Sequence, residues 1–268
     1  MTCEINVRLT VWATGKMPQM ENSGGLEQGK RSLLREQGRT AGELFGEARI
    51  ISITFAESKL LPVRAIVSRS RCRPTGKYPS WKMGRMMQWE STLELNVFRL
   101  LDCDARVELF VEQPCEIVYA FGPEVRRHYP DVLVQIPGEN QLWEIKSACD
   151  AARTEIKLRT HLLTEGLKTF GYSYRLVTQT VACEQPRLNN ATLLLQYGQQ
   201  PVNQVRREWV RVMVSRNTSL TWGAARAGRY GKDGRQLLCR LTLEGMLTVD
   251  MDRPISDETL FTSARERV

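Results

Sequence analysis

The segments HYPDVLV at residues 128–134 and LWEIK at residues 142–146 decide the fold that this sequence predicts. Both are short and mainly apolar, and the turn-forming residues PGEN lie between them, so we expect two strands joined by a turn. Side chains two residues apart on a strand project from the same face. Glu144 and Lys146 therefore project together, and the turn brings them back towards Asp131 on the first strand.

This combination of two carboxylates and one ammonium suits metal-assisted hydrolysis of a phosphodiester bond. Carboxylate oxygens are hard ligands of the kind that Mg²⁺ prefers, and Mn²⁺ accepts the same ligands. A lysine beside them can orient the attacking water or offset the negative charge that develops on the phosphate. The pattern of Asp131, Glu144 and Lys146 therefore predicts a magnesium-dependent nuclease.

The composition agrees with a protein that binds a polyanion. The chain has 268 residues, of which 38 are Lys or Arg, and its net charge is +8. A basic balance of this size favours nucleic acid as a partner, although a merely basic protein has the same composition. Hydrophobic residues make up 42% of the chain, which is enough for a core in one large or two ordinary domains.

The seven cysteines are scattered without a C-x-x-C pair, and there are only two histidines. This pattern argues against a disulfide framework and against a zinc site, and it favours a reducing, cytoplasmic compartment. No apolar run approaches the roughly 18 residues that a membrane span needs. The first residues also lack a basic flank followed by an apolar run, so the sequence predicts neither a membrane protein nor a signal peptide.

The N-terminal part of the chain is polar. Residues 1–45 have no sustained period, and we expect a loosely ordered extension there, followed by a short strand at 50–55. Between residues 63 and 82, six basic residues are interspersed with Pro and Gly, which disfavour a regular helix. This stretch is either an extended arm along a phosphate backbone or a solvated linker. The candidate DNA contacts in and beside it are Arg69, Arg71, Arg73, Lys77, Lys82 and Arg85.

A helix is predicted from Gln88 onwards, because apolar residues recur there at steps of three and four residues. Glu90 and Glu94 are four residues apart and lie on one face of this helix. Most helical glutamates are solvated. These two lie beside a buried stripe and upstream of Asp131 and Glu144, which makes them candidates for the same site.

The remaining segments up to residue 182 predict an α/β fold. Residues 106–119 favour one or two strands, residues 151–170 an amphipathic helix, and residues 175–178 a further strand. Helices and strands in this order form a mixed sheet flanked by helices. They define a predicted domain over residues 46–182.

A second, small α+β domain is predicted over residues 183–268, after a break at Cys183–Pro186. Its predicted elements are helices at 188–196 and 203–214, a short helix with a Ser or Thr cap starting within 219–223, and strands at 237–243 and 245–249. Helices followed by a hairpin form the outline of a winged helix. Such a module binds DNA or docks proteins, and both functions stay open.

Three further residues receive structural interpretations. His128 is placed at a strand end, where a histidine is more often on the surface than in contact with phosphate. Trp209 and Trp222 are expected in the core of the smaller domain rather than as platforms for stacked bases.

Taken together and in their order, these motifs resemble the TnsA family, the endonuclease subunit of heteromeric cut-and-paste transposases. The matching segments are GKYPSWKMGRM at 76–86, WESTLE at 89–94, EQP at 112–114, YPDVLV at 129–134 and LWEIK at 142–146. The resemblance covers residues 76–180, and the last third of the chain matches in outline only. It implies a restriction-endonuclease-like catalytic domain followed by a C-terminal winged-helix domain.

The resemblance also implies a role for each matching residue. The family's helical catalytic glutamate falls on Glu94, its metal-binding aspartate on Asp131, and its catalytic lysine on Lys146. Glu144 falls on a second metal-ligand position, which is Gln in some members. The implied metal ligands are thus Glu94, Asp131 and Glu144, while Glu90 is a candidate for orienting a ligand or a metal-bound water.

The implied reaction is Mg²⁺-dependent hydrolysis of one phosphodiester at each 5′ end of a mobile element in double-stranded DNA. The implied partners are a transposase subunit that cuts the 3′ ends and a regulatory ATPase of the AAA+ class, in the bacterial cytoplasm and near the nucleoid. Two other hypotheses stay open. One is a stand-alone restriction or repair endonuclease of the same fold, which would cut DNA alone. The other is a DNA-binding assembly subunit without catalysis, whose carboxylates only support structure.

Overall fold

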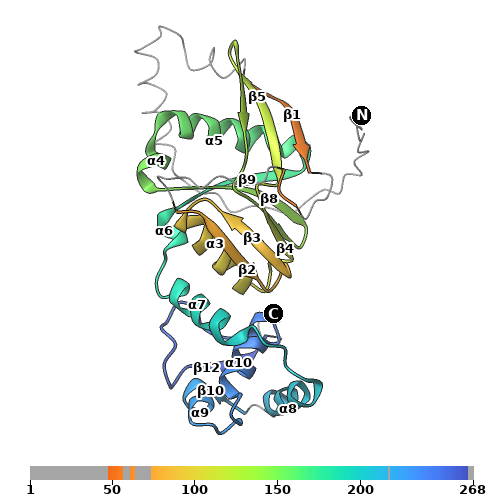
Figure 1. The fold of residues 1–268 in the computed structure, drawn as a ribbon, viewed down its shortest axis with the longest axis vertical. Coiled ribbons are helices and arrows are strands. Elements are labelled where there is room, and N and C mark those ends of the chain that lie inside the picture. Colours follow the sequence, from red (N-terminus) through yellow and green to blue (C-terminus); the bar gives the residue numbers. More distant parts are fainter. Residues whose placement is uncertain (1–47, 57–60, 64–73, 217, 265–268) are drawn as a thin grey trace.

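The computed structural model describes residues 48–56, 61–63, 74–216 and 218–264, and these form a mixed α/β structure (Figure 1), which confirms the predicted fold class. The predicted extension at residues 1–45 lies outside the described residues. So do three of the candidate DNA contacts, Arg69, Arg71 and Arg73. No helix in the described part of the chain is long and apolar enough to cross a membrane.

Strands predominate in the first part of the chain, and helices predominate in the second. The strands are β1 (Arg49–Phe55), β2 (Gly76–Ser80), β3 (Arg85–Trp89), β4 (Leu109–Glu112), β5 (Cys115–Phe121), β6 (Glu124–His128), β7 (Val132–Ile136), β8 (Glu139–Lys146), β9 (Tyr172–Thr178), β10 (Leu220–Thr221), β11 (Leu247–Thr248) and β12 (Leu260–Ser263). The helices are α3 (Thr92–Cys103), α4 (Ala148–Ala152), α5 (Thr154–Gly166), the 3-10 helix η1 (Leu167–Phe170), α6 (Gln179–Ala182), α7 (Arg187–Gly198), α8 (Gln204–Ser215), α9 (Trp222–Arg226) and α10 (Gly234–Leu243).

The central sheet has the strand order β4-β7-β8-β9. β7 and β8 form the antiparallel hairpin that the sequence predicts, with Val132 opposite Trp143. The pairing continues one residue before β7, since the amide of Asp131 donates to the carbonyl of Trp143 at 2.9 Å. β8 and β9 run parallel, and the chain between them passes through α4 and α5. Asp131 therefore lies at the start of one strand, towards the end of its neighbour, where Lys146 lies.

The first strand of the predicted hairpin is divided. His128 ends β6, which belongs to a separate sheet of order β1-β5-β6, and β7 begins only at Val132. Pro130 lies between the two strands and has no N–H to donate to a ladder. The division carries His128 to the neighbouring sheet.

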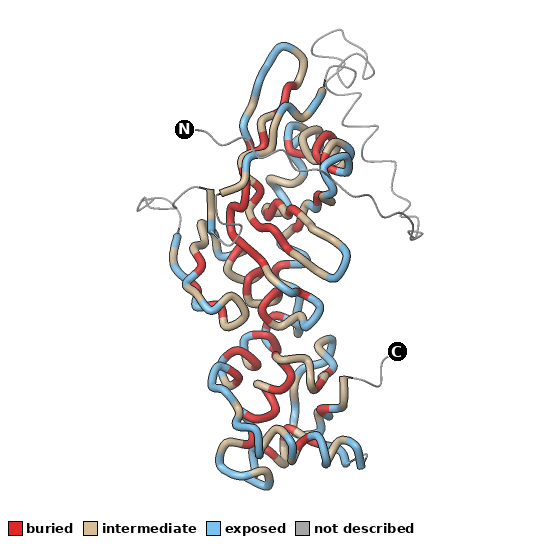
Figure 2. The backbone as a smooth tube through the Cα atoms, turned by 90° about the vertical axis from the view of Figure 1, so that its right-hand side faces the viewer, coloured by how far each residue is buried: buried red, intermediate tan, exposed pale blue. Residues whose placement is uncertain are grey.

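Two helices cover the two faces of the central sheet (Figure 1), because successive side chains of its strands point to opposite sides. Leu133 and Leu142 belong to a buried cluster with Leu163 of α5. Val132 belongs to a second cluster with Phe98 of α3. In Figure 2 the buried residues gather along these strands and again in the helices of the C-terminal part.

Residues 76–89 form the β2–β3 hairpin, not the extended arm or linker proposed for the stretch up to residue 82. A buried polar group fixes this hairpin to α3. Asp102 is fully buried, and it accepts hydrogen bonds from the hydroxyls of Tyr78 at 2.5 Å and Ser80 at 2.7 Å. The hairpin therefore packs on the helix that carries Glu94.

Most of the other predicted elements are confirmed, with three corrections. The helix expected from Gln88 onwards begins at Thr92, because Gln88 and Trp89 belong to β3; Glu90 therefore precedes the helix and does not share a helical face with Glu94. The helix expected over 151–170 is divided into α4, α5 and η1, with Arg153 in an extended conformation between the first two. The strand expected over 237–243 is helix α10, and only Leu247–Thr248 of the second expected strand is β structure. The apolar residues of this segment were taken for strand alternation. Leu237 and Leu241, four residues apart, are both fully buried, as one helical face requires.

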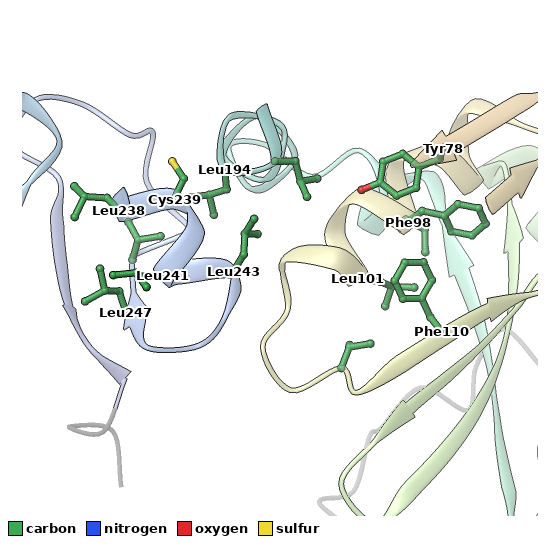
Figure 3. Close-up of a cluster of buried hydrophobic side chains, with 14 of the residues drawn as sticks. Tyr78, Phe98, Leu101, Phe110, Leu194, Leu238, Cys239, Leu241, Leu243 and Leu247 are labelled. Atoms are coloured by element: carbon green, nitrogen blue, oxygen red, sulfur yellow. The ribbon is translucent and has the colours of Figure 1, made fainter. Parts of the chain in front are cut away.

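The C-terminal part begins after the predicted break, since α6 ends at Ala182 and α7 begins at Arg187. α7 packs between α3 and α10, and Figure 3 shows Leu194 of α7 among the buried side chains of α10. One buried cluster includes both Phe110 of the central sheet and Leu238 of α10. The short sheet β10-β12-β11 closes this part, and Thr221 caps α9 as predicted.

Candidate active site

Two of the residues predicted from the hairpin meet at the end of the central sheet. Oδ2 of Asp131 accepts a hydrogen bond of 2.6 Å from the amide of Ile145 on β8. The ammonium of Lys146, the last residue of β8, lies 3.5 Å from the same oxygen. Asp131 and Lys146 are thus adjacent, as their places in the hairpin predict.

Glu144 lies on the same face of β8 as Lys146, and only 2% of its side chain is exposed. Its Oε1 is 2.8 Å from the ammonium of Lys146 and 2.9 Å from the guanidinium of Arg159 on α5. Its Oε2 is 3.0 Å from Nε2 of His128 and 3.4 Å from the hydroxyl of Tyr174 on β9. Neighbouring side chains therefore engage both oxygens of this carboxylate.

His128 is buried, which corrects the expectation that it lies on the surface. Burial lowers its pKa, so the imidazole is neutral near pH 7. Because an ionised carboxylate only accepts hydrogen bonds, the contact with Glu144 requires the proton on Nε2. The division of the predicted strand explains the error, because it makes His128 the last residue of β6, where its ring contacts Glu144 and Tyr174.

Arg159 and Tyr174 were missed by the sequence analysis. Tyr174 was outside the predicted strand, and no spacing rule joins it to Glu144. Arg159 did leave a signal, since it lies three residues after Ile156 and four before Leu163, both of which are buried. A charged residue within a core-facing stripe requires a buried partner of opposite charge.

Glu94 lies in the first turn of α3 and is buried. The hydroxyl of Ser91, the N-cap, accepts a hydrogen bond from the amide of Glu94 and donates one to its Oε1 at 2.8 Å. Oε2 of Glu94 accepts a hydrogen bond from the amide of Glu90 at 2.9 Å. These contacts resemble a capping box, which the pattern Ser91-Thr92-Leu93-Glu94 contains and the sequence analysis overlooked. The carboxylate of Glu90 lies 3.1 Å from the side-chain amide of Gln113.

The carboxylates differ in their electrostatics. Burial raises the pKa of Asp131 to about 8, and the negative charges of Glu144 and Glu94 add to this effect. Burial also raises the pKa of Glu94. Burial acts in the same direction on Glu144, but the hydrogen bond from His128 and the charge of Lys146 outweigh it and lower the pKa of Glu144 to about 2. Near pH 7 Glu144 is therefore ionised, whereas the ammonium of Lys146 offsets the rise in the pKa of Asp131 only in part.

The three predicted ligands fit a divalent cation unequally. Asp131 and Glu94 are oxygen donors whose pKa values a nearby cation would lower. Oδ1 of Asp131 accepts no hydrogen bond within the described part of the chain. Glu144 fits less well, because four side chains already contact its oxygens. Among the described residues no three His, Cys, Asp or Glu side chains lie close enough together to hold a metal ion. Metal binding here stays a prediction.

The described candidate DNA contacts are of two kinds. Lys77 is exposed on β2. The ammonium of Lys82 instead donates to three backbone carbonyls at or beyond the end of α3, at 2.7–2.9 Å. The guanidinium of Arg85 pairs with both oxygens of the buried Glu112, at 2.8 and 2.5 Å. Lys82 and Arg85 are therefore engaged by groups of the protein itself, and their assignment as DNA contacts stays a prediction.

Comparison with known proteins adds no family to this geometry. No protein-family model matches the sequence, and a search of curated proteins finds no match. The resemblance to the TnsA family rests on the motifs quoted above.

Proposed function

We propose that this protein is a Mg²⁺-dependent DNA endonuclease, and that it is the transposase subunit that hydrolyses one phosphodiester at each 5′ end of a mobile element. The observation that carries the proposal is the contact between Asp131 and Lys146 at the end of a sheet, where Glu94 and Glu144 both raise the pKa of Asp131. Strongly shifted carboxylates beside a lysine are typical of catalytic sites. The order of the motifs, which resembles that of the TnsA family, is the reason for proposing 5′-end cleavage in particular.

The proposed architecture is a restriction-endonuclease-like domain over residues 46–182 and a winged-helix-like domain over residues 183–268. The sheet β4-β7-β8-β9, with α3 and α5 on its faces and the acidic residues at its end, supports the first assignment. The succession of α8, α9 and α10, followed by the pair β11 and β12, supports the second.

In the proposed reaction each residue has a task that its contacts allow. Asp131 and Glu94 would hold Mg²⁺, which when bound activates water and stabilises charge on the phosphate and on the leaving 3′ oxygen. Lys146 donates a hydrogen bond to the attacking water or to a phosphate oxygen. Because Glu144 holds this ammonium at 2.8 Å, the lysine is oriented before the substrate arrives.

The proposed substrate is double-stranded DNA at transposon ends. The net charge of +8 favours its approach, and Lys77 is an exposed candidate contact. We assign the choice of site to two partners, a transposase subunit that cuts the 3′ ends and a regulatory AAA+ ATPase, since the sequence contains no motif typical of base-specific recognition.

The test is nicking of a transposon-end duplex whose strands carry different labels. The protein is assayed alone and with its transposase partner, in Mg²⁺ and in EDTA, as wild type and as Asp131→Ala. We expect 5′-end cleavage that needs both Mg²⁺ and the partner and that Asp131→Ala abolishes. Asp252→Ala is the matched control, because Asp252 is an exposed aspartate of the C-terminal part.

Two outcomes would favour the other hypotheses. Mg²⁺-dependent cutting by the protein alone indicates a stand-alone restriction or repair endonuclease. Cleavage at the wild-type rate by the Asp131→Ala complex contradicts the proposed active site and favours a non-catalytic assembly subunit. The observation that favours this last function is that the ionised carboxylate of Glu144 is already paired with Lys146 and Arg159. A metal ligand is usually not occupied by the protein's own cations.

A further inference from the structure

We propose that Arg159 is a positioning residue of this site, which fixes the carboxylate of Glu144 and, through it, the ammonium of Lys146. Glu144 is then the anchor of the lysine rather than a metal ligand. The consequence for catalysis rests on the proposed nuclease function, whereas the positioning of Lys146 rests on the contacts alone.

The contacts around Glu144 come from four different elements of the fold. Oε1 is shared by two cations, the ammonium of Lys146 at 2.8 Å and the guanidinium of Arg159 at 2.9 Å. Oε2 is held from the other side by His128 of β6 and Tyr174 of β9. A carboxylate held from β6, β8, β9 and α5 cannot rotate without breaking several contacts. Its position, and with it the place offered to the ammonium, is therefore fixed.

Lys146 connects this anchored carboxylate to the reactive end of the sheet. Its ammonium contacts Glu144 at 2.8 Å and Asp131 at 3.5 Å, so it lies between the two acids. Among the residues that the structure describes, Arg159 forms an ion pair with Glu144 only. Removing the guanidinium would leave Oε1 with a single cation and release one of the four restraints on Glu144. The ammonium of Lys146 would then be free to move with that carboxylate, away from Asp131.

The arrangement is hard to explain by stability alone. Side-chain exposure is 2% for Glu144 and 16% for Arg159, and an ion pair so deep in a protein costs desolvation that its attraction often does not recover. Nε of Arg159 is also buried without a hydrogen-bond partner among the described residues, which adds a further cost. A pair that requires desolvation of both ions and leaves one N–H without a partner, yet is well defined in geometry, suits a positioning role.

The first test compares single-turnover cleavage by the complete transposase complex containing Arg159→Met or Lys157→Met. Met keeps the length of the side chain without its charge, and Lys157 is an exposed residue of the same helix. We expect Arg159→Met to slow cleavage by about 10–100-fold, as loss of a supporting contact typically does. The DNA affinity of Arg159→Met should be unchanged, and Lys157→Met should cleave at the wild-type rate. An equal rate for Arg159→Met would overturn the proposal.

Two further variants separate positioning from general damage to the fold. Arg159→Lys keeps a charge beside Glu144 and should recover most of the rate. Adding Arg159→Met to Glu144→Gln should slow cleavage less than twofold further, because the residue through which Arg159 acts is already changed. Fully multiplicative effects of the two substitutions would contradict the proposal.

A readout without metal or DNA keeps this inference distinct from the proposed function. In NMR spectra of the full-length protein in EDTA, the ¹⁵Nζ signal of Lys146, assigned by its loss in Lys146→Arg, should show slow hydrogen exchange. Arg159→Met should accelerate that exchange and Lys157→Met should not. If the wild type cuts no DNA under any condition but the exchange changes as expected, the nuclease proposal fails and the positioning role stands. Unchanged exchange in both Arg159→Met and Arg159→Lys would refute the positioning role.

Discussion

Two buried groups of this protein combine an aspartate with a lysine, and they have opposite characters. We define the Asp102 cluster as Asp102, Tyr78, Ser80 and Lys82, and the Asp131 cluster as Asp131, Glu94, Glu144 and Lys146. In the Asp102 cluster both carboxylate oxygens accept hydrogen bonds from hydroxyls. The ammonium of Lys82 does not contact the carboxylate but donates to backbone carbonyls around the end of α3, while the backbone amide of Lys82 donates to Oδ1 of Asp102 at 3.4 Å.

The Asp131 cluster contains acids where the other cluster contains donors. One oxygen of Asp131 receives the amide of Ile145 and the ammonium of Lys146, while two further carboxylates raise its pKa. Burial also raises the pKa of Asp102, but there the hydroxyls of Tyr78 and Ser80 lower it. A raised pKa alone therefore does not identify a functional acid. The neighbours do, since donors complete a structural group and additional acids leave a demand for positive charge.

The largest expected effect is on the cleavage rate, and it distinguishes Lys146 of the Asp131 cluster from Lys82 of the Asp102 cluster. Lys146→Met should lower the single-turnover rate of 5′-end cleavage by about 10³-fold, within the range typical of a lost proton donor or charge stabiliser. Its effect on stability should be small, because the pair with Glu144 is partly replaced by Arg159. Rate and urea midpoint are measured on the same preparation.

Lys82→Met is the matched variant of the other cluster, and the opposite result is expected for it. It leaves three backbone carbonyls without their ammonium, so it should lower the urea midpoint while the cleavage rate per folded molecule stays unchanged. A loss of DNA affinity in folded Lys82→Met would support the interpretation of this residue as a DNA contact and weaken the comparison.

The next effect concerns the Asp102 cluster. Asp102→Ala removes the acceptor of two buried hydroxyls and opens a cavity, so the free energy of unfolding should fall by about 3 kcal/mol. Urea denaturation followed by tryptophan fluorescence measures it. Asp104→Ala, at a half-buried neighbour paired with the exposed Arg106, serves as the control and should change stability by less than about 1 kcal/mol. Equal losses in both variants would show that the buried group is not the anchor of the β2–β3 hairpin.

The comparison also shows which parts of the site a sequence predicts. Adjacent strands with a short turn place Asp131 beside Lys146, because strand period and hairpin geometry are local rules. The same rules place Glu144 and Lys146 on one face, as the structure has them. They do not specify which side chains of α5 or β9 approach that face. The contacts of Arg159 and Tyr174 with Glu144 could therefore not be predicted from them.

The errors have equally local causes. The basic stretch with Pro and Gly that contains Lys82 was expected to be an extended arm or a solvated linker, whereas pairing of β2 with β3 forms a hairpin and brings Lys82 and Arg85 into contact with protein acceptors. The strand predicted at 237–243 failed because Leu and Cys at close intervals suit either period, and packing against α7 selected the helix. Tertiary contact decided each of these cases.

The raised pKa of Asp131 makes the stability of the protein depend on pH. This dependence tests whether Asp131, unlike Asp102, lacks sufficient donors for its carboxylate. The pKa is about 8 in the folded protein and about 3.9 in an unfolded chain. The folded state therefore binds more protons between these values, so this group makes stability fall as pH rises from about 4 to about 8. In EDTA, Asp131→Asn should remove that decline and should be more stable than the wild type at pH 8, by on the order of 2 kcal/mol.

Glu144 provides the internal control, because its shift has the opposite sign. Its pKa of about 2 in the folded protein contributes stability that is present above its unfolded pKa of about 4.3 and is lost as pH falls towards 2. Urea midpoints from pH 3 to pH 9 separate the two windows. A wild type and an Asp131→Asn variant with parallel profiles between pH 4 and pH 8 would show that Asp131 is compensated in the folded protein, and the contrast with Asp102 would disappear.

The smallest effect concerns Glu94, which, like Asp102, accepts a short hydrogen bond from a hydroxyl. Ser91→Ala removes the hydroxyl that caps α3 and holds Oε1 of Glu94 at 2.8 Å. Loss of an N-cap should lower the free energy of unfolding by about 1 kcal/mol, whereas Ser91→Thr keeps the hydroxyl and most of the stability. Cleavage by Ser91→Ala should fall by severalfold only, because the amide of Glu90 still holds the other oxygen of Glu94.

If Ser91→Ala stops cleavage as completely as Glu94→Gln does, the hydrogen bond from Ser91 is required to hold Glu94 in its catalytic position. If Glu94→Gln leaves cleavage unchanged, Glu94 belongs with Asp102 as a structural acid, since Gln also completes a capping box.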